Sequence, residues 1–213
     1  SQHELPVVKT LVVALGDMGA REAVPALIRV MQGYVGVRSL AAKALGKLGD
    51  VQAAEALVAA MRDEKSRSLQ LCAMRSLGQL EYQAAAPMIR SFLKEQDPRL
   101  RRTAALTLGL LKDQDAVPAL LKMAREDESP LVRPAAVEAI GLVGDPRAID
   151  KLLPFVDDGN AYLRAALAHA LSSLDGSTPQ VRRALKKLSG DSVRHVAIAA
   201  ERALANCVGF EGS

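Results

Sequence analysis

The chain has 213 residues, of which 49% are hydrophobic and only 3% are aromatic, with no tryptophan. A compact core usually draws on Phe, Tyr and Trp, each of which buries a large area, so this composition argues against such a core and favours many closely packed helices of Ala, Leu and Val. The formal net charge of +4 is modest for this length and does not by itself indicate a nucleic-acid partner.

The sequence gives a few indications of where the protein works. No apolar run reaches the length of a membrane span, and no signal peptide is visible. Cys72 and Cys207 lie far apart without the spacing of metal ligands, which indicates free thiols and fits a reducing compartment. We therefore predict a cytoplasmic protein without a membrane partner. The initial Ser in place of Met indicates that the true N-terminus was removed, and the uncovered N-terminal helix described next leads us to expect a fragment of a longer protein.

Residues 1–19 are predicted to form half of a structural repeat. The segment LPVVKTLVVALGDMG (5–19) carries an apolar stripe at Val8, Leu11, Val12 and Leu15, as an amphipathic helix does. No second helix precedes it to cover this stripe. We expect the uncovered N-terminal helix to pair with upstream residues or with a second copy of the chain, which would make the protein self-associate.

Five repeats are predicted to follow, at about residues 20–50, 51–81, 82–113, 114–145 and 146–176. Each begins with an amphipathic helix, named helix A, as in REAVPALIRVM (21–31). Each ends with helix B, whose phrase VRSLAAKALGKLGD (37–50) returns as LVRPAAVEAIGLVGD (131–145). The phrase recurs about every 31 residues, the length that two short helices and two turns need. Since such a hairpin cannot bury its apolar face alone, neighbouring hairpins are expected to stack.

Glycine and proline mark the expected turns and contacts. Gly49 and Gly144 are predicted to end helix B in a left-handed conformation, and the aspartate after each is predicted to cap the next helix. Three prolines occupy one column at the expected first turn of helix A, or at a tolerated bend there: Pro25, Pro87 and Pro118. A glycine column late in helix B predicts that a neighbouring helix passes too closely for a Cβ: Gly16, Gly46, Gly78, Gly109 and Gly141.

Residues 177–213 are predicted to form a divergent C-terminal capping repeat. The segment VRHVAIAAERALANC (193–207) keeps the Val-Arg opening of helix B but shifts the Ala-Leu pair by about three residues.

The phrase V-R-x-x-A-A-x-A-L-G-x-L-G-D in helix B and the run A-V-P-x-L in helix A resemble short bacterial-type HEAT-like repeats, a type also found in phycobilin lyases. The resemblance covers essentially the whole chain. It implies an all-α fold, a right-handed α-α superhelix or solenoid of six to seven HEAT-like helical hairpins, forming one domain over residues 1–213. HEAT-like solenoids serve many purposes, so the fold does not specify a function.

The resemblance also implies a structural role for the arginine that opens helix B. In HEAT-like families this arginine bonds to acidic loop residues of adjacent repeats, which forms a ladder. Asp97 is the expected partner of Arg101, and Asp157 or Asp158 that of Arg164, whereas Gln70 takes the arginine position in the third repeat. The predicted ladder residues are Arg38, Arg101, Arg133 and Arg164.

In solenoids of this family helix B lines the concave surface, and a 100° turn per residue places three positions per helix away from the buried stripe. The partner-binding residues predicted on that face are Lys43, Lys47, Leu71, Arg75, Arg102, Leu106, Leu110 and Leu142. Exposed leucines with a basic rim often mark an interaction site. The alternative is that the helical phase is off by one and some of these leucines belong to the core.

The chain lacks the common sequence motifs for catalysis and for cofactor binding. The chain has no P-loop, no G-x-S-x-G and no H-E-x-x-H, and His3, His169 and His195 lack an obvious third metal ligand, so no metal or other cofactor is expected. Deoxyhypusine hydroxylase resembles the chain in fold, but its metal-binding His-Glu pairs after Val-Arg are replaced here, for example by Ser39-Leu40 and Ala165-Ala166. That activity is excluded.

We therefore predict a non-catalytic scaffold for protein–protein interaction. One alternative left open is a bilin lyase or chaperone-like subunit of the phycobiliprotein lyase type, in which an apolar groove with a basic rim would hold a tetrapyrrole. A nucleic-acid-binding HEAT-like protein is disfavoured by the few aromatic residues and the alternating charges of the predicted face.

Overall fold

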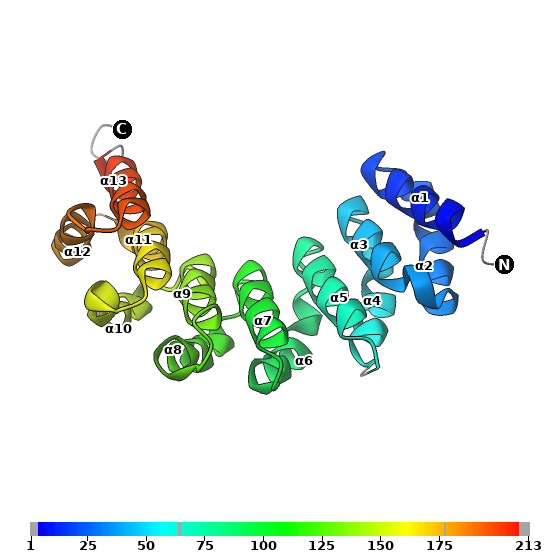
Figure 1. The fold of residues 1–213 in the computed structure, drawn as a ribbon, viewed down its shortest axis with the longest axis horizontal. Helices are drawn as coiled ribbons and strands as arrows, with labels where there is room; N and C mark the ends of the chain where they lie inside the picture. The colour runs from blue at the N-terminus through cyan, green and yellow to red at the C-terminus, as the bar shows by residue number, and fades with distance from the viewer. Residues whose placement is uncertain (1–3, 64, 177, 209–213) are drawn as a thin grey trace. The chain divides into compact units, whose positions relative to one another are not determined.

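The computed structural model describes residues 4–63, 65–176 and 178–208. In these segments the chain forms thirteen α-helices, several of them flanked by a turn of 3₁₀-helix, and no strand (Figure 1). The chain folds as two compact units, residues 1–107 and 108–213. The fold class is all-α, a superhelix of helical hairpins in which even-numbered helices are copies of helix A and odd-numbered helices are copies of helix B.

In the first unit, α2 packs on α3 and α4 packs on α5 to form hairpins, while the B helices α1, α3 and α5 pack side by side. The last residues of α7 lie beyond residue 107 and belong to the second unit. The helices are α1 (Glu4–Asp17), α2 (Val24–Gly33), α3 (Arg38–Leu48), α4 (Ala54–Met61), α5 (Arg67–Gln79), α6 (Ala86–Ser91) and α7 (Pro98–Leu110).

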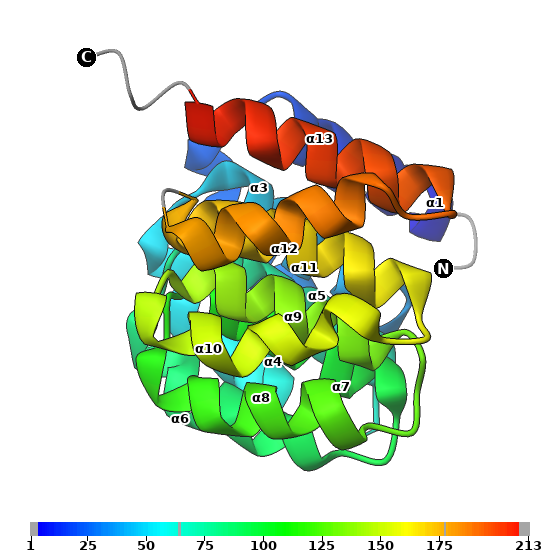
Figure 2. The same ribbon diagram turned by 90° about the vertical axis from the view of Figure 1, so that its left-hand side faces the viewer.

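The second unit repeats this arrangement. Helices α8 and α12 pack on α9 and α13, and the B helices α9, α11 and α13 pack side by side; Figure 2 shows α11, α12 and α13 together. Its helices are α8 (Val117–Glu126), α9 (Val132–Val143), α10 (Ile149–Leu152), α11 (Ala161–Asp175), α12 (Pro179–Ser189) and α13 (Arg194–Val208).

Most copies of helix A begin with one turn of 3₁₀-helix. The backbone N–H of Ala23 donates to the carbonyl of Ala20 at 3.0 Å, and α2 starts only at Val24. Pro25 therefore lies in the first turn of the α-helix, as Pro87 and Pro118 do in α6 and α8. At that position proline sacrifices no intrahelical hydrogen bond. The predicted location of the proline column is confirmed.

The predicted left-handed turn after helix B is confirmed in two repeats, and two further repeats have the same turn without glycine. Gly49 and Gly144 have φ values of 68° and 79°, and the side chain of Asp50 accepts the backbone N–H of Gln52 at 2.9 Å. Glu81 and Lys112 adopt the same left-handed conformation, each with φ of 52°. The sequence did not indicate these two turns, because neither residue is one that favours that region.

The glycine column marks close contacts between successive B helices. A Cβ on Gly141 of α9 would lie 2.7 Å from the Cα of Ala170 in α11, and a Cβ on Gly109 would lie 2.9 Å from the Cα of Ala139. In the first unit a Cβ on Gly46 would lie 2.4 Å from the hydroxyl oxygen of Ser76. These distances confirm the predicted reason for glycine at these three positions.

The core consists mainly of leucine, alanine, valine and methionine, as the composition predicted. Within the described segments, no helix combines the length and the apolar character that a membrane crossing requires. The repeat boundaries and the single solenoid domain over residues 1–213 stay predictions.

Candidate functional site

The first rung of the arginine ladder lies in the first unit. The Nε of Arg38 donates to the carbonyl of Met31 at 2.9 Å, and its Nη1 donates to Oδ2 of Asp63 at 2.5 Å. Met31 lies in the last turn of helix A of the same hairpin, whereas Asp63 belongs to the loop of the next one. The hydrogen bonds from Arg38 and from the backbone of Lys65 hold the pKa of the Asp63 carboxyl below its ordinary value. One guanidinium thus joins two hairpins.

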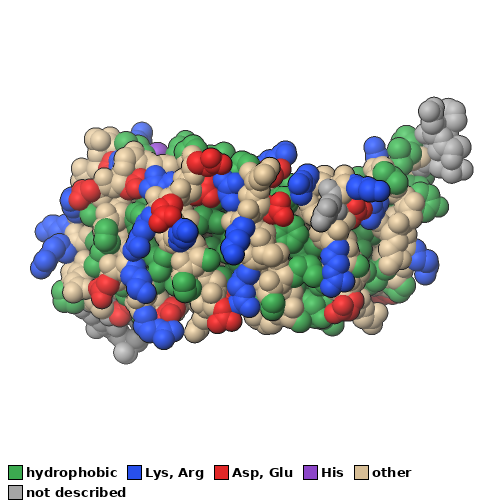
Figure 3. Space-filling model, turned by 90° about the horizontal axis from the view of Figure 1, so that it is seen from below, with side chains coloured by type: hydrophobic (Ala, Val, Ile, Leu, Met, Phe, Trp, Pro, Cys, Tyr) green, Lys and Arg blue, Asp and Glu red, His purple; other side chains and the backbone are tan. Residues whose placement is uncertain are grey.

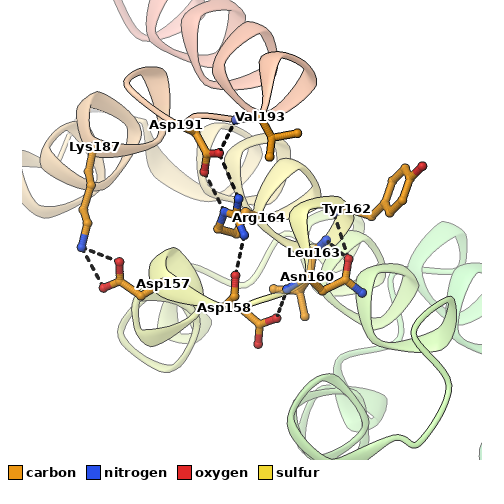
Figure 4. A network of polar contacts seen from close by, with 9 residues as sticks. All are labelled: Asp157, Asp158, Asn160, Tyr162, Leu163, Arg164, Lys187, Asp191 and Val193. Carbon is orange, nitrogen blue, oxygen red and sulfur yellow. Dashed lines mark hydrogen bonds and ion pairs between the residues drawn. The ribbon is translucent and has the colours of Figure 1, made fainter.

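Two further rungs lie in the second unit. Arg133 donates to the carbonyl of Ala124 at 2.9 Å and forms an ion pair with the carboxylate of Asp158. Arg164 binds both carboxylate oxygens of Asp191, at 2.7 and 2.9 Å, and donates to the carbonyl of Asp158 at 2.6 Å (Figure 4). The hydrogen bond from Arg164 lowers the pKa of Asp191 below its ordinary value. In both units, therefore, an arginine at the start of helix B links one hairpin to the next.

The ladder differs from expectation in where its carboxylates come from. Arg101 is buried and donates to the carbonyls of Glu95 and Gln96 at 2.9 and 2.8 Å, while the carboxylate of Asp97 bonds to the guanidinium of Arg99. In the three rungs described above, the carboxylate follows its arginine by 25 or 27 residues rather than preceding it. These partners were not predicted, because the expected carboxylates lie in the loop that precedes each arginine.

In the first unit, the predicted partner-binding side chains lie on the solvent-facing side of the B helices. Lys43 of α3 and Arg75 of α5 are exposed, and Leu71 of α5 is half-buried. Lys43 lines a small pocket of about 50 Å³ between α1 and α3, together with Val13 and Leu40. Leu40 lies at the margin of the face predicted from the sequence, whereas Val13 of α1 is an addition to it.

The remaining predicted residues of the first unit have differing surroundings. Lys47 forms an exposed ion pair with Asp17 of α1, so its charge is partly compensated. Arg102 is exposed and Leu106, one turn further along α7, is half-buried.

Two predicted leucines belong to the second unit. Leu110 and Leu142 are 46% and 40% exposed. Gly109, the neighbour of Leu110, lies against Leu142, since a Cβ added there would lie 3.1 Å from the Leu142 Cβ. None of the four predicted leucines belongs to the buried core, so the helical phase used for them agrees with the structure. Their contact with a partner stays a prediction.

The reactive side chains elsewhere form no metal centre in the described part of the chain, where no three His, Cys, Asp or Glu residues are grouped to hold an ion. His3 lies outside the described residues. His169 is exposed, and His195 stacks on Tyr162 with ring centroids 5.1 Å apart. Burial raises the pKa of the Cys72 thiol, against the opposing charges of Arg75 and Lys43. Cys72 is therefore held in the thiol form at neutral pH.

Figure 3 shows the side on which A helices such as α6 and α8 lie, not the B-helix side; there, basic and acidic side chains are interspersed with apolar ones. Binding to a nucleic-acid backbone uses clustered Lys and Arg along a groove. The described residues of that face show no continuous basic track of this kind.

Comparison with solved structures shows the fold. The complex of CpcE and CpcF of phycocyanin lyase from Nostoc sp. PCC7120 is similar with a TM-score of 0.58 and 23% identity, over 72% of this chain and 99% of that one. Two engineered proteins, each 19% identical, have TM-scores of 0.60 and 0.57; the first match covers 94% of this chain and 64% of the other, the second 89% and 92%. At such identities the likeness is one of fold alone, so the bilin-lyase alternative stays a prediction.

No curated protein matches the sequence. A family model of HEAT repeats matches it three times, over residues 6–71, 65–141 and 117–205, which together span most of the chain. These matches cover the helical hairpins and ladder arginines of both units, and the chain therefore belongs to the HEAT repeat family.

Proposed function

We propose that this protein is a non-catalytic scaffold that binds a protein partner through the solvent-facing side of its B helices, which is the concave surface in solenoids of this family and is called the helix-B face. The supporting observation is the composition of that face in the first unit. Apolar side chains at Val13, Leu40 and Leu71 lie on α1, α3 and α5, which pack side by side, and the exposed cations Lys43 and Arg75 lie among them. Leu106 of α7 adds a further apolar side chain to this face in the first unit. Leu110 and Leu142 provide a similar apolar surface on the second unit.

Such a surface suits protein recognition better than it suits catalysis. Each leucine that becomes fully covered in a complex contributes about 1.5–3 kcal/mol, less where it is already half-buried. The cations add orientation and association rate rather than much affinity. The partner expected from this chemistry presents an apolar patch with acidic residues at its edge.

The test is a pull-down from lysate of the source organism with the 213-residue chain and a Leu71→Glu/Leu106→Glu variant. We expect the native chain to capture a specific protein and the variant to lose it, because two new charges would be buried at the interface. The matched control is Ala26→Glu/Ala59→Glu, which adds the same charge to positions of helix A in α2 and α4 that are not buried. This control is expected to keep the captured protein.

Circular dichroism decides whether the comparison is valid, since Leu71 and Leu106 are half-buried. If the leucine variant unfolds, Lys43→Glu/Arg75→Glu, at two exposed positions, takes its place and is expected to weaken capture at least about tenfold. Retention of the same partner by folded variants of both kinds would contradict the proposal.

We also propose that the protein self-associates through α1. The stripe predicted to be uncovered is only partly so, since Val12 is buried and Val8 and Leu15 are half-buried, whereas Leu11 is 55% exposed. Val7, one turn before Leu11, and Met18, just after the end of α1, are 59% and 79% exposed. An apolar stripe of this kind pairs readily with its own copy around a two-fold axis. Light scattering is expected to show a mass that rises with concentration for the native chain and the monomer mass for Leu11→Glu. A constant monomer mass for the native chain up to millimolar concentration would disprove this association.

A further inference from the structure

One position of the ladder in the first unit has no arginine. Gln70 of α5 occupies it, is 2% exposed, and donates from Nε2 to the carbonyl of Met61 at 3.0 Å, as Arg38 donates from Nε to the carbonyl of Met31. Glu95 follows Gln70 by the same 25 residues that separate arginine and aspartate in two complete rungs. Glutamine is shorter than arginine and has fewer N–H donors. Gln70 therefore keeps the hydrogen bond to the carbonyl of Met61 but does not bind the carboxylate of Glu95 as a ladder arginine would.

The space that a guanidinium would fill is open. A cavity of about 400 Å³ lies at this position, which is within the range of sites that hold small ligands or single side chains of a peptide. Besides Gln70, its lining combines apolar Met61, Met88 and Phe92 with charged Arg62, Arg67 and Glu95. This pocket is called the open rung.

The charges in the open rung do not balance. Arg67 donates from Nη1 to Oε1 of Gln70 at 3.1 Å and lies 4.0 Å from Oε2 of Glu95, a loose ion pair between two partly exposed side chains. The guanidinium of Arg62 makes no hydrogen bond or ion pair with any residue that the structure describes; its backbone N–H donates to the carbonyl of Ala59. Among the lining residues that the structure describes, two guanidinium groups therefore face one carboxylate, so this lining has an excess of one positive charge.

An anion with the geometry of a carboxylate suits this arrangement. Guanidinium groups bind carboxylates through paired hydrogen bonds, and Arg164 with Asp191 shows that pairing in the same fold. A cationic side chain entering the pocket would instead meet Arg62 and Arg67. The apolar side chains of Met88 and Phe92 can cover a residue next to the carboxylate.

We propose that the open rung binds an aspartate or glutamate side chain of a partner peptide, with an adjacent apolar residue against Met88 and Phe92. This inference rests on the proposed function in that the ligand belongs to a protein partner, but it uses a pocket at the loop edge of the hairpins, with no residue in common with the helix-B face.

Methionine methyl resonances of the full 213-residue chain report on the pocket directly. The protein has six methionines, of which Met61 and Met88 line the open rung, while Met18, Met31, Met74 and Met123 do not. The probe is the blocked dipeptide acetyl-Asp-Leu-amide, compared with its Asn and Arg counterparts and with inorganic phosphate. We expect the Asp probe to shift the Met61 and Met88 signals saturably, with a dissociation constant on the order of millimolar, and the Asn probe to bind at least about tenfold more weakly.

Two variants test the assignment. Arg62→Gln/Arg67→Gln is expected to weaken binding of the Asp probe about tenfold or more, whereas Arg21→Gln/Arg29→Gln, at positions elsewhere in the unit that are not buried, is expected to leave it unchanged. Gln70→Arg should refill the pocket with a ladder arginine that reaches Glu95, so that binding is lost and the thermal midpoint rises. Gln52→Arg, at an exposed site, is the control for the added charge.

Several results would overturn the proposal: equal shifts with the Asn probe, no saturable shift of Met61 and Met88, tighter binding of phosphate or of the Arg probe, or unchanged binding by the folded Arg62→Gln/Arg67→Gln variant. If the open rung fails while Leu71→Glu/Leu106→Glu still loses its partner, the scaffold function stands without this site. If the dipeptide binds while capture is unaffected by changes in the helix-B face, the pocket stands and the proposed face fails.

Discussion

Replacing Gly141 with alanine is expected to lower the free energy of unfolding of the second unit by about 1–3 kcal/mol, although alanine is the better helix former by about 1 kcal/mol. The new Cβ would lie 2.7 Å from the Cα and 2.8 Å from the Cβ of Ala170. The first of these atoms is backbone and cannot rotate away, so α9 and α11 must move apart. Gly141→Leu should cost more than about 3 kcal/mol, since its further carbons have no space between the helices.

The control is Gly33→Ala in α2, where a Cβ would meet no atom within 4 Å. This change is expected to be neutral or to stabilise by up to about 1 kcal/mol, as helix propensity alone predicts. Thermal unfolding followed by circular dichroism measures both. Ala170→Gly should partly rescue Gly141→Ala by removing one of the two clashing atoms. A Gly141→Ala protein as stable as Gly33→Ala would contradict the close helix contact.

Arg164→Met is expected to destabilise the second unit by about 1–3 kcal/mol. The substitution removes the bidentate pair with Asp191 and the donor to the carbonyl of Asp158, and the paired side chains are only 14% and 10% exposed. Water therefore replaces the lost hydrogen bonds incompletely. The matched control is Arg147→Met. In the native protein the guanidinium of Arg147 forms the same bidentate pair with Asp145, but its side chain is 81% exposed. Solvent competes for that pair, so no measurable loss is expected.

The stabilising effect of the Arg164–Asp191 pair should depend on pH. Since Arg164 lowers the folded-state pKa of Asp191 below the unfolded value of about 3.9, the contribution is fully present above that pH and is lost as the pH falls through the folded pKa. The difference in thermal midpoint between native protein and Arg164→Met should therefore narrow below about pH 4. A difference that stays constant down to about pH 2 would show that the carboxylate's charge contributes nothing.

Local patterns in the sequence were sufficient for the helical hairpins and for several of their boundaries. Apolar residues spaced by helical turns identify the helices, and Gly49 and Gly144 followed by aspartate identify two turns, because each of these signals acts over a few neighbouring residues. The structural role of the arginines that open helix B was expected from the resemblance to HEAT-like repeats. The helical phase that places Leu110 and Leu142 on the surface also follows from periodicity alone.

The tertiary structure decided what depends on contacts between hairpins. It pairs Arg38 and Arg164 with Asp63 and Asp191, residues 25 and 27 positions away, which only stacking brings together. It also shows that a pocket lies where Gln70 replaces the arginine of the other repeats. The sequence could not show this pocket, because its walls are side chains from two successive hairpins. The repeat is thus a local property of the chain, whereas its candidate site arises from the packing of one repeat on the next.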